Sequence, residues 1–508
     1  MKDTKNLDVK SPLLTWTFGL MCILAVVARA DEMILPAVYF EVAASLQCGP
    51  TFLGVITLSR GVAQSCAALL SGSLGSRQGR ITLISAGCIL WALATAAVGA
   101  SWNKGSIVVS RIFNGFGLGF TTPLVLAIVA DLFPSSSRGA AYGAIGMASN
   151  AGAALGAVLA TYLAGHERIG MASGWRVAFW IVASVSIVLG AAIHFWARDP
   201  RLNGTGKLGL NSNLGLSRAD IITKTKAVLE LRTFWVLVGQ GVFFLVPWYA
   251  LNYFTLWLEL SGWTHARAAS IRLCFDIGMA AGVVLGGKVS DWASLTWGGG
   301  GRRIATAQFS VGIGIPLWLG ILLLPWENKA NGAIGLSCLC FITGLLTQWE
   351  FPSKASILAE LVPPSASTSI FALSQAIEGV ISAVSAPLAG LIAERAFGFS
   401  SRKKKSGVDD EVETQRQSET NAKALASAMA VCLAVSWFIC VGTMGIAHKT
   451  FPADKERQRC ANESDNSLQD TYEVAAHHPK GITTYNPVHG DNTNSREEPG
   501  TFIELRTK

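Results

Sequence analysis

The sequence predicts an all-α membrane protein of twelve transmembrane helices in two pseudo-symmetric bundles of six. Three observations support this fold class: an apolar composition, repeated runs long enough to cross a bilayer, and a sequence repeat between the two halves. Of 508 residues, 51% are apolar and 15% are charged, and the mean hydropathy is +0.41. Because soluble domains carry about one quarter charged residues, this composition excludes a soluble fold.

Twelve apolar segments are long enough to span a membrane. About 20 helical residues cross the bilayer core at roughly 1.5 Å per residue, whereas barrel strands are about ten residues long and alternate in polarity. These runs therefore indicate helices. The expected spans are 13–40, 51–75, 81–100, 106–133, 140–164, 175–197, 233–260, 264–287, 304–325, 332–362, 366–393 and 423–447.

The spans divide the chain into four predicted parts. These are a six-helix bundle over 1–197, a polar linker with an amphipathic helix over 198–232, a second bundle over 233–447, and a disordered polar tail over 448–508. Lysine and arginine concentrate in segments that place both termini in the cytoplasm, except for the basic outer loop 394–422. We expect a multi-pass protein of the plasma membrane or an organelle membrane.

A set of residues on the fourth span recurs at a constant offset on the tenth. The pairs are Gly115/Gly344, Pro123/Pro352, Ala130/Ala359, Asp131/Glu360, Leu132/Leu361 and Pro134/Pro363. A second echo links Gly72–Arg80, at the end of span two, with Gly287–Asp291, at the end of span eight. Parallel six-helix repeats are typical of transporters that rock two halves around a central site.

Charged residues interrupt the first span at Arg29, Asp31 and Glu32. Such charges are costly in a membrane, so they should pair or face a wet cavity. Arg29 and Glu32, three residues apart, can pair on one helix face, whereas Asp31 points elsewhere. Arg111 on span four also needs a partner, which these residues could supply. The alternative is an amphipathic N-terminal helix on the membrane surface.

The second half has its own membrane-embedded charges. Arg272 with Asp276, and Glu350 with Lys354, have the i, i+4 spacing of intrahelical pairs. Glu378 lies mid-span without a cation on its own helix, so we expect it to be protonated or to face water.

Polar and aromatic residues gather near the middle of the seventh span. They either pack, or line a site for an amphipathic or ring-shaped solute. The expected substrate-binding residues are Gln240, Trp248, Tyr249, Asn252 and Tyr253, together with Arg29 and Glu350.

The loop between spans two and three resembles the signature of the major facilitator superfamily. The matching residues are Gly72, Arg77, Gly79 and Arg80, and the second-half copy keeps Gly287 and Asp291. The resemblance implies that these basic residues latch the cytoplasmic side by meeting carboxylates and helix C-termini. The alternative for Arg77 and Arg80 is that they only anchor the topology as positive residues on the inner side. The expected latch comprises Gly72, Arg77, Gly79, Arg80, Asp131, Arg138 and Asp291.

Span four, Arg111-Ile-Phe-Asn-Gly-Phe-Gly117, is similar to the superfamily's Arg-x-x-x-Gly-x-Gly pattern, in which the arginine is linked to proton transfer. Within the superfamily, Ala30-Asp31, Leu90-Trp-Ala92 and Ile128-Val-Ala-Asp-Leu-Phe133 resemble the Spinster-like group. The chain departs from that group in having Asp31-Glu32 for Asp-Arg and Gly117-Leu-Gly119 for Gly-Glu-Ala.

The resemblance implies a secondary active transporter that moves a small organic solute or lipid-like molecule by alternating access, coupled to protons. Asp31, Glu32, Arg111 and Glu378 are the expected coupling residues. A membrane sensor or scaffold that retains the fold without transport is the alternative. No cysteine or histidine spacing indicates a metal site, and we expect a monomer with no cofactor, no nucleic-acid partner and no enzyme activity.

Overall fold

A computed structural model describes residues 12–200 except 134, 167 and 171, and residues 226–296, 301–326, 330–362, 367–400 and 410–477. It separates into two compact units, Met1–Lys455 and Glu456–Lys508, and the membrane helices belong to the first. Most of the predicted linker and the end of the predicted tail lie outside the described residues, although residues 226–229 are helical.

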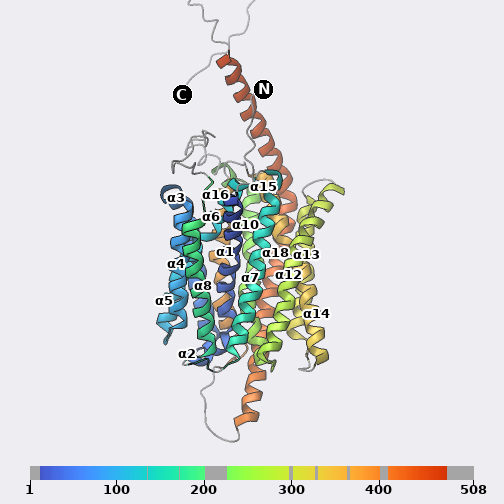
Figure 1. Cartoon of the computed structure of the whole chain (residues 1–508). Helices are drawn as coiled ribbons and strands as arrows, with labels where there is room; N and C mark the ends of the chain where they lie inside the picture. The colour runs from blue at the N-terminus through green and yellow to red at the C-terminus, as the bar shows by residue number, and fades with distance from the viewer. Residues whose placement is uncertain are drawn as a thin grey trace, which may run out of the picture. The chain divides into compact units, whose positions relative to one another are not determined.

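The first eight helices precede the linker and carry the first six spans (Figure 1). Gly79, whose φ of +81° suits glycine, turns the chain between α3 and α4. Asn103 caps α5 by accepting a hydrogen bond from the Ser106 backbone amide at 2.8 Å. The helices are α1 (Pro12–Ala37), α2 (Tyr39–Leu46), α3 (Pro50–Gln78), α4 (Arg80–Gly99), α5 (Lys104–Gly119), α6 (Thr121–Leu132), α7 (Ser135–Ala164) and α8 (Gly174–Trp196).

The remaining helices follow the linker. Pro247 lies inside α10, one turn before a short 3-10 helix that breaks the seventh span. The elements are α10 (Arg232–Ala250), η1 (Leu251–Tyr253), α11 (Phe254–Leu260), α12 (His265–Thr296), α13 (Gly301–Leu323), α14 (Ala330–Thr347), α15 (Glu350–Leu361), α16 (Ser367–Ala383), α17 (Ser385–Arg395) and α18 (Asp410–His477).

Eleven segments of the described chain are long and apolar enough to cross a membrane. Together with α1, which carries the three charges of the first span, they match the predicted twelve. The last span differs most from its predicted bounds, because α18 begins at Asp410 and continues through His477. Helix therefore extends into the predicted outer loop 394–422 and into the tail that we expected to be disordered from residue 448.

The repeat between the two halves is visible in the backbone. The fourth span breaks between α5 and α6 at Phe120, and the tenth breaks between α14 and α15 at the corresponding Trp349. A Cβ at Gly115 would clash with the Arg60 backbone of α3, and one at Gly344 would clash with the Phe275 backbone of α12. Equivalent glycines thus bring equivalent helices together, which confirms the pseudo-symmetric fold.

Within each bundle, the closest helix pairs are α1 with α7, α3 with α5, α4 with α8, and α12 with α14. Gly152 and Gly156 of α7 lie against the backbone of Val26 and Ala30 in α1, so these glycines form a small-residue packing face on α7. The most extensive contacts between the bundles are those of α3 with α16 and α17 and of α7 with α12, and smaller contacts join α1 and α2 to α11.

Candidate functional site

Asp31 is the centre of a buried polar network in the first bundle. Its side chain is fully buried and accepts a hydrogen bond from the Thr95 hydroxyl of α4 at 2.6 Å and from Nδ2 of Asn114 in α5 at 2.9 Å. Neither donor is charged. The fold thus satisfies a carboxyl group inside the membrane region with neutral groups from two neighbouring helices.

Glu32 is held differently, by two arginines. Arg29 pairs with it on α1, as the spacing predicts, and Nη1 of Arg60 from α3 lies 3.2 Å from Glu32 Oε1. Arg60 also donates from Nε to Asn114 Oδ1 at 3.1 Å, which joins the Glu32 pair to the Asp31 network. Two guanidinium groups favour the anionic form of Glu32.

Arg111 is 1% exposed, but the structure does not give it the expected ion pair. Its Nε and Nη1 atoms have no hydrogen-bond partner among the described residues. Arg60 occupies the place at Glu32 that we assigned to Arg111, because it reaches the carboxylate from the facing helix α3. Arg111 therefore has two buried donors that no hydrogen bond among the described residues satisfies.

The second bundle contains buried polar groups of its own, and their pairing differs from the one expected from spacing. Lys354 of α15 lies 2.7 Å from Glu378 of α16, and the Ser374 hydroxyl also donates to this carboxylate. Glu350 instead accepts from Nε2 of Gln240 at 2.7 Å. The expected Glu350–Lys354 pairing and the expected isolated Glu378 are both wrong, because the lysine extends across to the neighbouring helix. The predicted Arg272–Asp276 pair is present at 3.1 Å.

The residues proposed from span seven have different surroundings. Trp248 packs on the rings of Phe244, Phe275 and Trp437, so its environment is that of a core residue. Tyr249 lies within electrostatic range of Glu32, Arg29 and Arg60. Asn252 is half-buried. A small pocket lies beside Gln240 and Lys354, and also contacts Leu237, Ile304, Ala307, Ile357, Met444 and Ala447.

Tyr253 lies at the end of the molecule that carries α2. Its hydroxyl is 2.6 Å from the Pro50 carbonyl oxygen and 3.0 Å from that of Ala386. Beside it, the Thr51 amide and hydroxyl donate to the two carboxylate oxygens of Glu394 at 3.0 and 2.7 Å. These bonds tie α3 of the first bundle to α17 of the second.

Two groups at the same end, outside the spans, have raised pKa values. Burial, and then the neighbouring Glu259 carboxylate, raise the pKa of Glu41 to about 7. Burial raises the pKa of the Cys48 thiol to about 11.

Of the predicted latch, the structure describes one ion-paired centre. Arg80 at the start of α4 lies 2.7 Å from Asp131 at the end of α6 and 3.7 Å from Asp199 after α8. Arg80 and Asp131 belong to the first bundle and Asp199 to the start of the linker, so in this conformation Arg80 joins elements of the first half of the chain. The side chains of the latch residues Gly72, Arg77, Arg138 and Asp291 lie outside the described part of the structure.

Sequence reasoning missed Arg60, Thr95 and Asn114. Arg60 was recognisable as a lone charge within an apolar span, which needs a partner. Thr95 and Asn114 carried no such signal, because uncharged polar residues are common in membrane helices.

The chain is similar to several known proteins. A sequence profile described as Major Facilitator Superfamily matches residues 20–386. The 3-(3-hydroxy-phenyl)propionate transporter of Escherichia coli strain K12 is 26% identical over 224 residues, which are 44% of this chain and 52% of that protein. A triacylglyceride transporter of Mycolicibacterium smegmatis is 29% identical over 126 residues, or 25% of this chain and 22% of that protein. The chain thus spans about half or less of these relatives.

Among solved structures, the fold is similar to an inward-facing, unoccupied crystal structure of a bacterial homologue of the human lysosomal transporter Spinster. The TM-score is 0.72 at 17% identity, and the alignment covers 88% of this chain and 99% of the other. At this identity the similarity concerns the fold.

Proposed function

Since the chain belongs to the major facilitator superfamily, we propose that it is a secondary active transporter that works by alternating access. It moves a small organic solute or a lipid-like molecule across the membrane in which it is embedded, and protons drive the movement. The observation that carries this proposal is the buried Asp31 network, joined through Arg60 to Glu32 at the heart of the first bundle.

Asp31 is the proton carrier in this mechanism. Glu32 is fixed as an anion by Arg29 and Arg60, whereas Asp31 receives hydrogen bonds only from the neutral Thr95 and Asn114 among the described residues. Because two arginines already hold Glu32, Asp31 is the carboxyl group of this network that we assign to proton uptake. Binding and release of that proton change the charge around Asn114 and Arg60, next to the α3–α5 contact.

Arg111 supports a substrate with an anionic or strongly accepting group. Its two unused donors are buried, and a buried unsatisfied guanidinium is costly unless a ligand completes it. The relatives include proteins named for transport of a phenylpropionate and of a triacylglyceride, which both combine an apolar body with oxygen acceptors. A substrate of this kind would place its acceptor at Arg111.

The second bundle supplies the counterpart. The Lys354–Glu378 pair lies on α15 and α16, and α16 packs directly on α3. When the two halves rock, α16 moves against α3. Formation of the Lys354–Glu378 ion pair can therefore depend on the conformation of the first bundle. In this proposal the α3–α17 bonds keep the α2 end closed, and the substrate enters from the opposite end. If both termini are placed in the cytoplasm and the protein is a monomer, as we propose, closure of the α2 end corresponds to an inward-facing conformation.

Uptake into proteoliposomes tests the proposal. The purified full chain is reconstituted, and a panel of labelled aromatic acids, fatty acids, lysolipids and sugars is offered with and without a pH gradient. We expect accumulation of at least one member, several-fold higher with the gradient. Asp31→Asn should abolish gradient-driven accumulation and retain counterflow, whereas the exposed Glu230→Gln control should behave as wild type.

A non-transporting sensor is the second candidate, favoured by the Gly117-Leu-Gly119 sequence that replaces a carboxylate of the Spinster-like pattern. It predicts ligand binding, seen as a raised melting temperature, without uptake or counterflow of the same compound. Uptake of any bound compound excludes it.

A further inference from the structure

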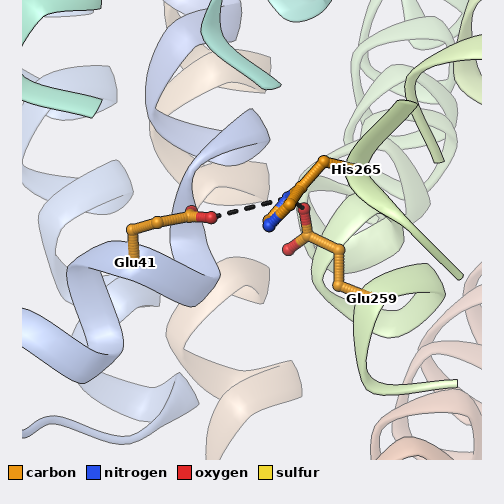
Figure 2. A group of neighbouring side chains, drawn as sticks. All are labelled: Glu41, Glu259 and His265. Carbon is orange, nitrogen blue, oxygen red and sulfur yellow. Dashed lines mark hydrogen bonds and ion pairs between the residues drawn. The ribbon is translucent and has the colours of Figure 1, made fainter. Parts of the chain in front are cut away.

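Three ligand-type side chains meet at the α2 end, away from the Asp31 network (Figure 2). Glu41 comes from α2, Glu259 from the end of α11, and His265 from the start of α12. Nδ1 of His265 lies 2.8 Å from Glu259 Oε1 and 3.6 Å from Glu41 Oε1. One potential ligand atom from each residue lies within 4.8 Å of the other two.

The oxygen atoms of this cluster are buried and largely unused. The Glu259 side chain is 4% exposed, and its Oε2 has no hydrogen-bond partner among the described residues. Both carboxylate oxygens of Glu41 also lack a hydrogen bond. Because buried carboxylate oxygens ordinarily receive hydrogen bonds or coordinate a cation, the cluster is incomplete as it stands.

The chemistry of the set matches a divalent transition-metal ion. Two carboxylates balance the charge of one divalent cation, and a neutral imidazole adds a nitrogen ligand. Zinc accepts such mixed nitrogen and oxygen ligands at about 2.0–2.2 Å, which requires ligand atoms about 3.3 Å apart. The side chains need to move by less than about 1.5 Å to reach that spacing, whereas magnesium and calcium prefer sites made wholly of oxygen.

We propose that Glu41, Glu259 and His265 form a binding site for a divalent transition-metal cation such as Zn²⁺, completed by water. The site joins α2 of the first bundle to α11 and α12 of the second. A bound ion therefore crosslinks the two halves beside the Thr51–Glu394 and Tyr253 contacts and keeps this end closed. Glu41 lies more than 200 residues before Glu259 and His265, which are six residues apart, so no spacing motif reveals the full set.

Metal binding to the purified full chain tests the site without any transported substrate. Isothermal titration with ZnCl₂ should show one saturable site that His265→Ala, Glu41→Gln and Glu259→Gln each weaken at least tenfold. The exposed His166, at the same end, provides the matched control, and His166→Ala should bind as wild type. Co²⁺ in place of Zn²⁺ should give the visible absorption of a four-coordinate nitrogen and oxygen site, and excess Mg²⁺ should not displace it.

The effect on transport is a separate arm that rests on the proposed function. Zn²⁺ on the α2 side should inhibit uptake by wild type and by His166→Ala, and have at least tenfold less effect on His265→Ala. If wild type binds no Zn²⁺, or if His265→Ala and Glu41→Gln bind it as tightly as His166→Ala does, the site does not exist. If binding holds and no compound is taken up by metal-free protein, the proposed function fails while the metal site stands.

Discussion

The pairing of Lys354 with Glu378 predicts a large energetic coupling between two helices. The charged groups are 2.7 Å apart, and the side chains are only 14% and 7% exposed. Removing one partner of a buried pair leaves an uncompensated charge and typically costs about 3–5 kcal/mol. We therefore expect Lys354→Met and Glu378→Gln each to lower the free energy of unfolding by about 3 kcal/mol.

The double variant removes both charges and should cost no more than about 3 kcal/mol in total, so the coupling energy is about 3 kcal/mol. Titration with sodium dodecyl sulfate in mixed micelles measures the four unfolding free energies. Glu350→Gln is the matched control, because the i, i+4 spacing predicts that Lys354 pairs with Glu350 rather than with Glu378. A coupling of Lys354 to Glu350 that equals or exceeds its coupling to Glu378 would refute the observed pairing.

Three further predictions concern packing, reactivity and the latch. Gly156→Ala should destabilise the protein by about 1–3 kcal/mol, because the added Cβ would meet the α1 backbone. Gly146→Ala on the same helix is the control, because its Cβ would meet nothing within 4 Å and should leave stability unchanged. Thermal unfolding of both variants measures the difference. Cys48, 5% exposed and with a pKa of about 11, should react with N-ethylmaleimide at pH 7.5 only after denaturation and faster as pH rises towards 11; rapid labelling of folded protein would contradict its burial. Arg80→Ala should lower both the melting temperature and the uptake rate, Arg80→Lys should restore part of each, and unchanged values would reduce the residue to a topology anchor.

Much of the architecture could be predicted because membrane solvation constrains it strongly. Apolar run length gave the spans, and the Gly115/Gly344 repeat anticipated helix contacts that the structure places at equivalent positions. Boundaries failed at α18, where polar residues continue a helix beyond the apolar segment. Hydropathy indicates which residues of a helix can lie in lipid, but it does not indicate where the helix ends in water.

The site was only partly predictable. The intrahelical pairs Arg29–Glu32 and Arg272–Asp276 followed from spacing, because both partners lie on one helix face. Lys354 pairs with Glu378 on another helix. Its long side chain can reach several helices, so its partner depends on helix packing, which sequence spacing does not reveal. The cluster at His265 could not be predicted for the same reason, because its three side chains come from separate helices that only packing brings together.

Distances between spin labels at the two ends of the molecule test alternating access most directly. In a background without native cysteines, labels at Ser45 and Ala266 report on the α2 end, and labels at Trp196 and Arg302 report on the opposite end. In nanodiscs we expect two distance populations at each end, which shift reciprocally with pH, so that one end shortens as the other lengthens. Asp31→Asn, which mimics the protonated acid, should hold the low-pH distribution at every pH. Single, pH-independent distances at both ends, unchanged by Asp31→Asn, would contradict proton-coupled alternating access.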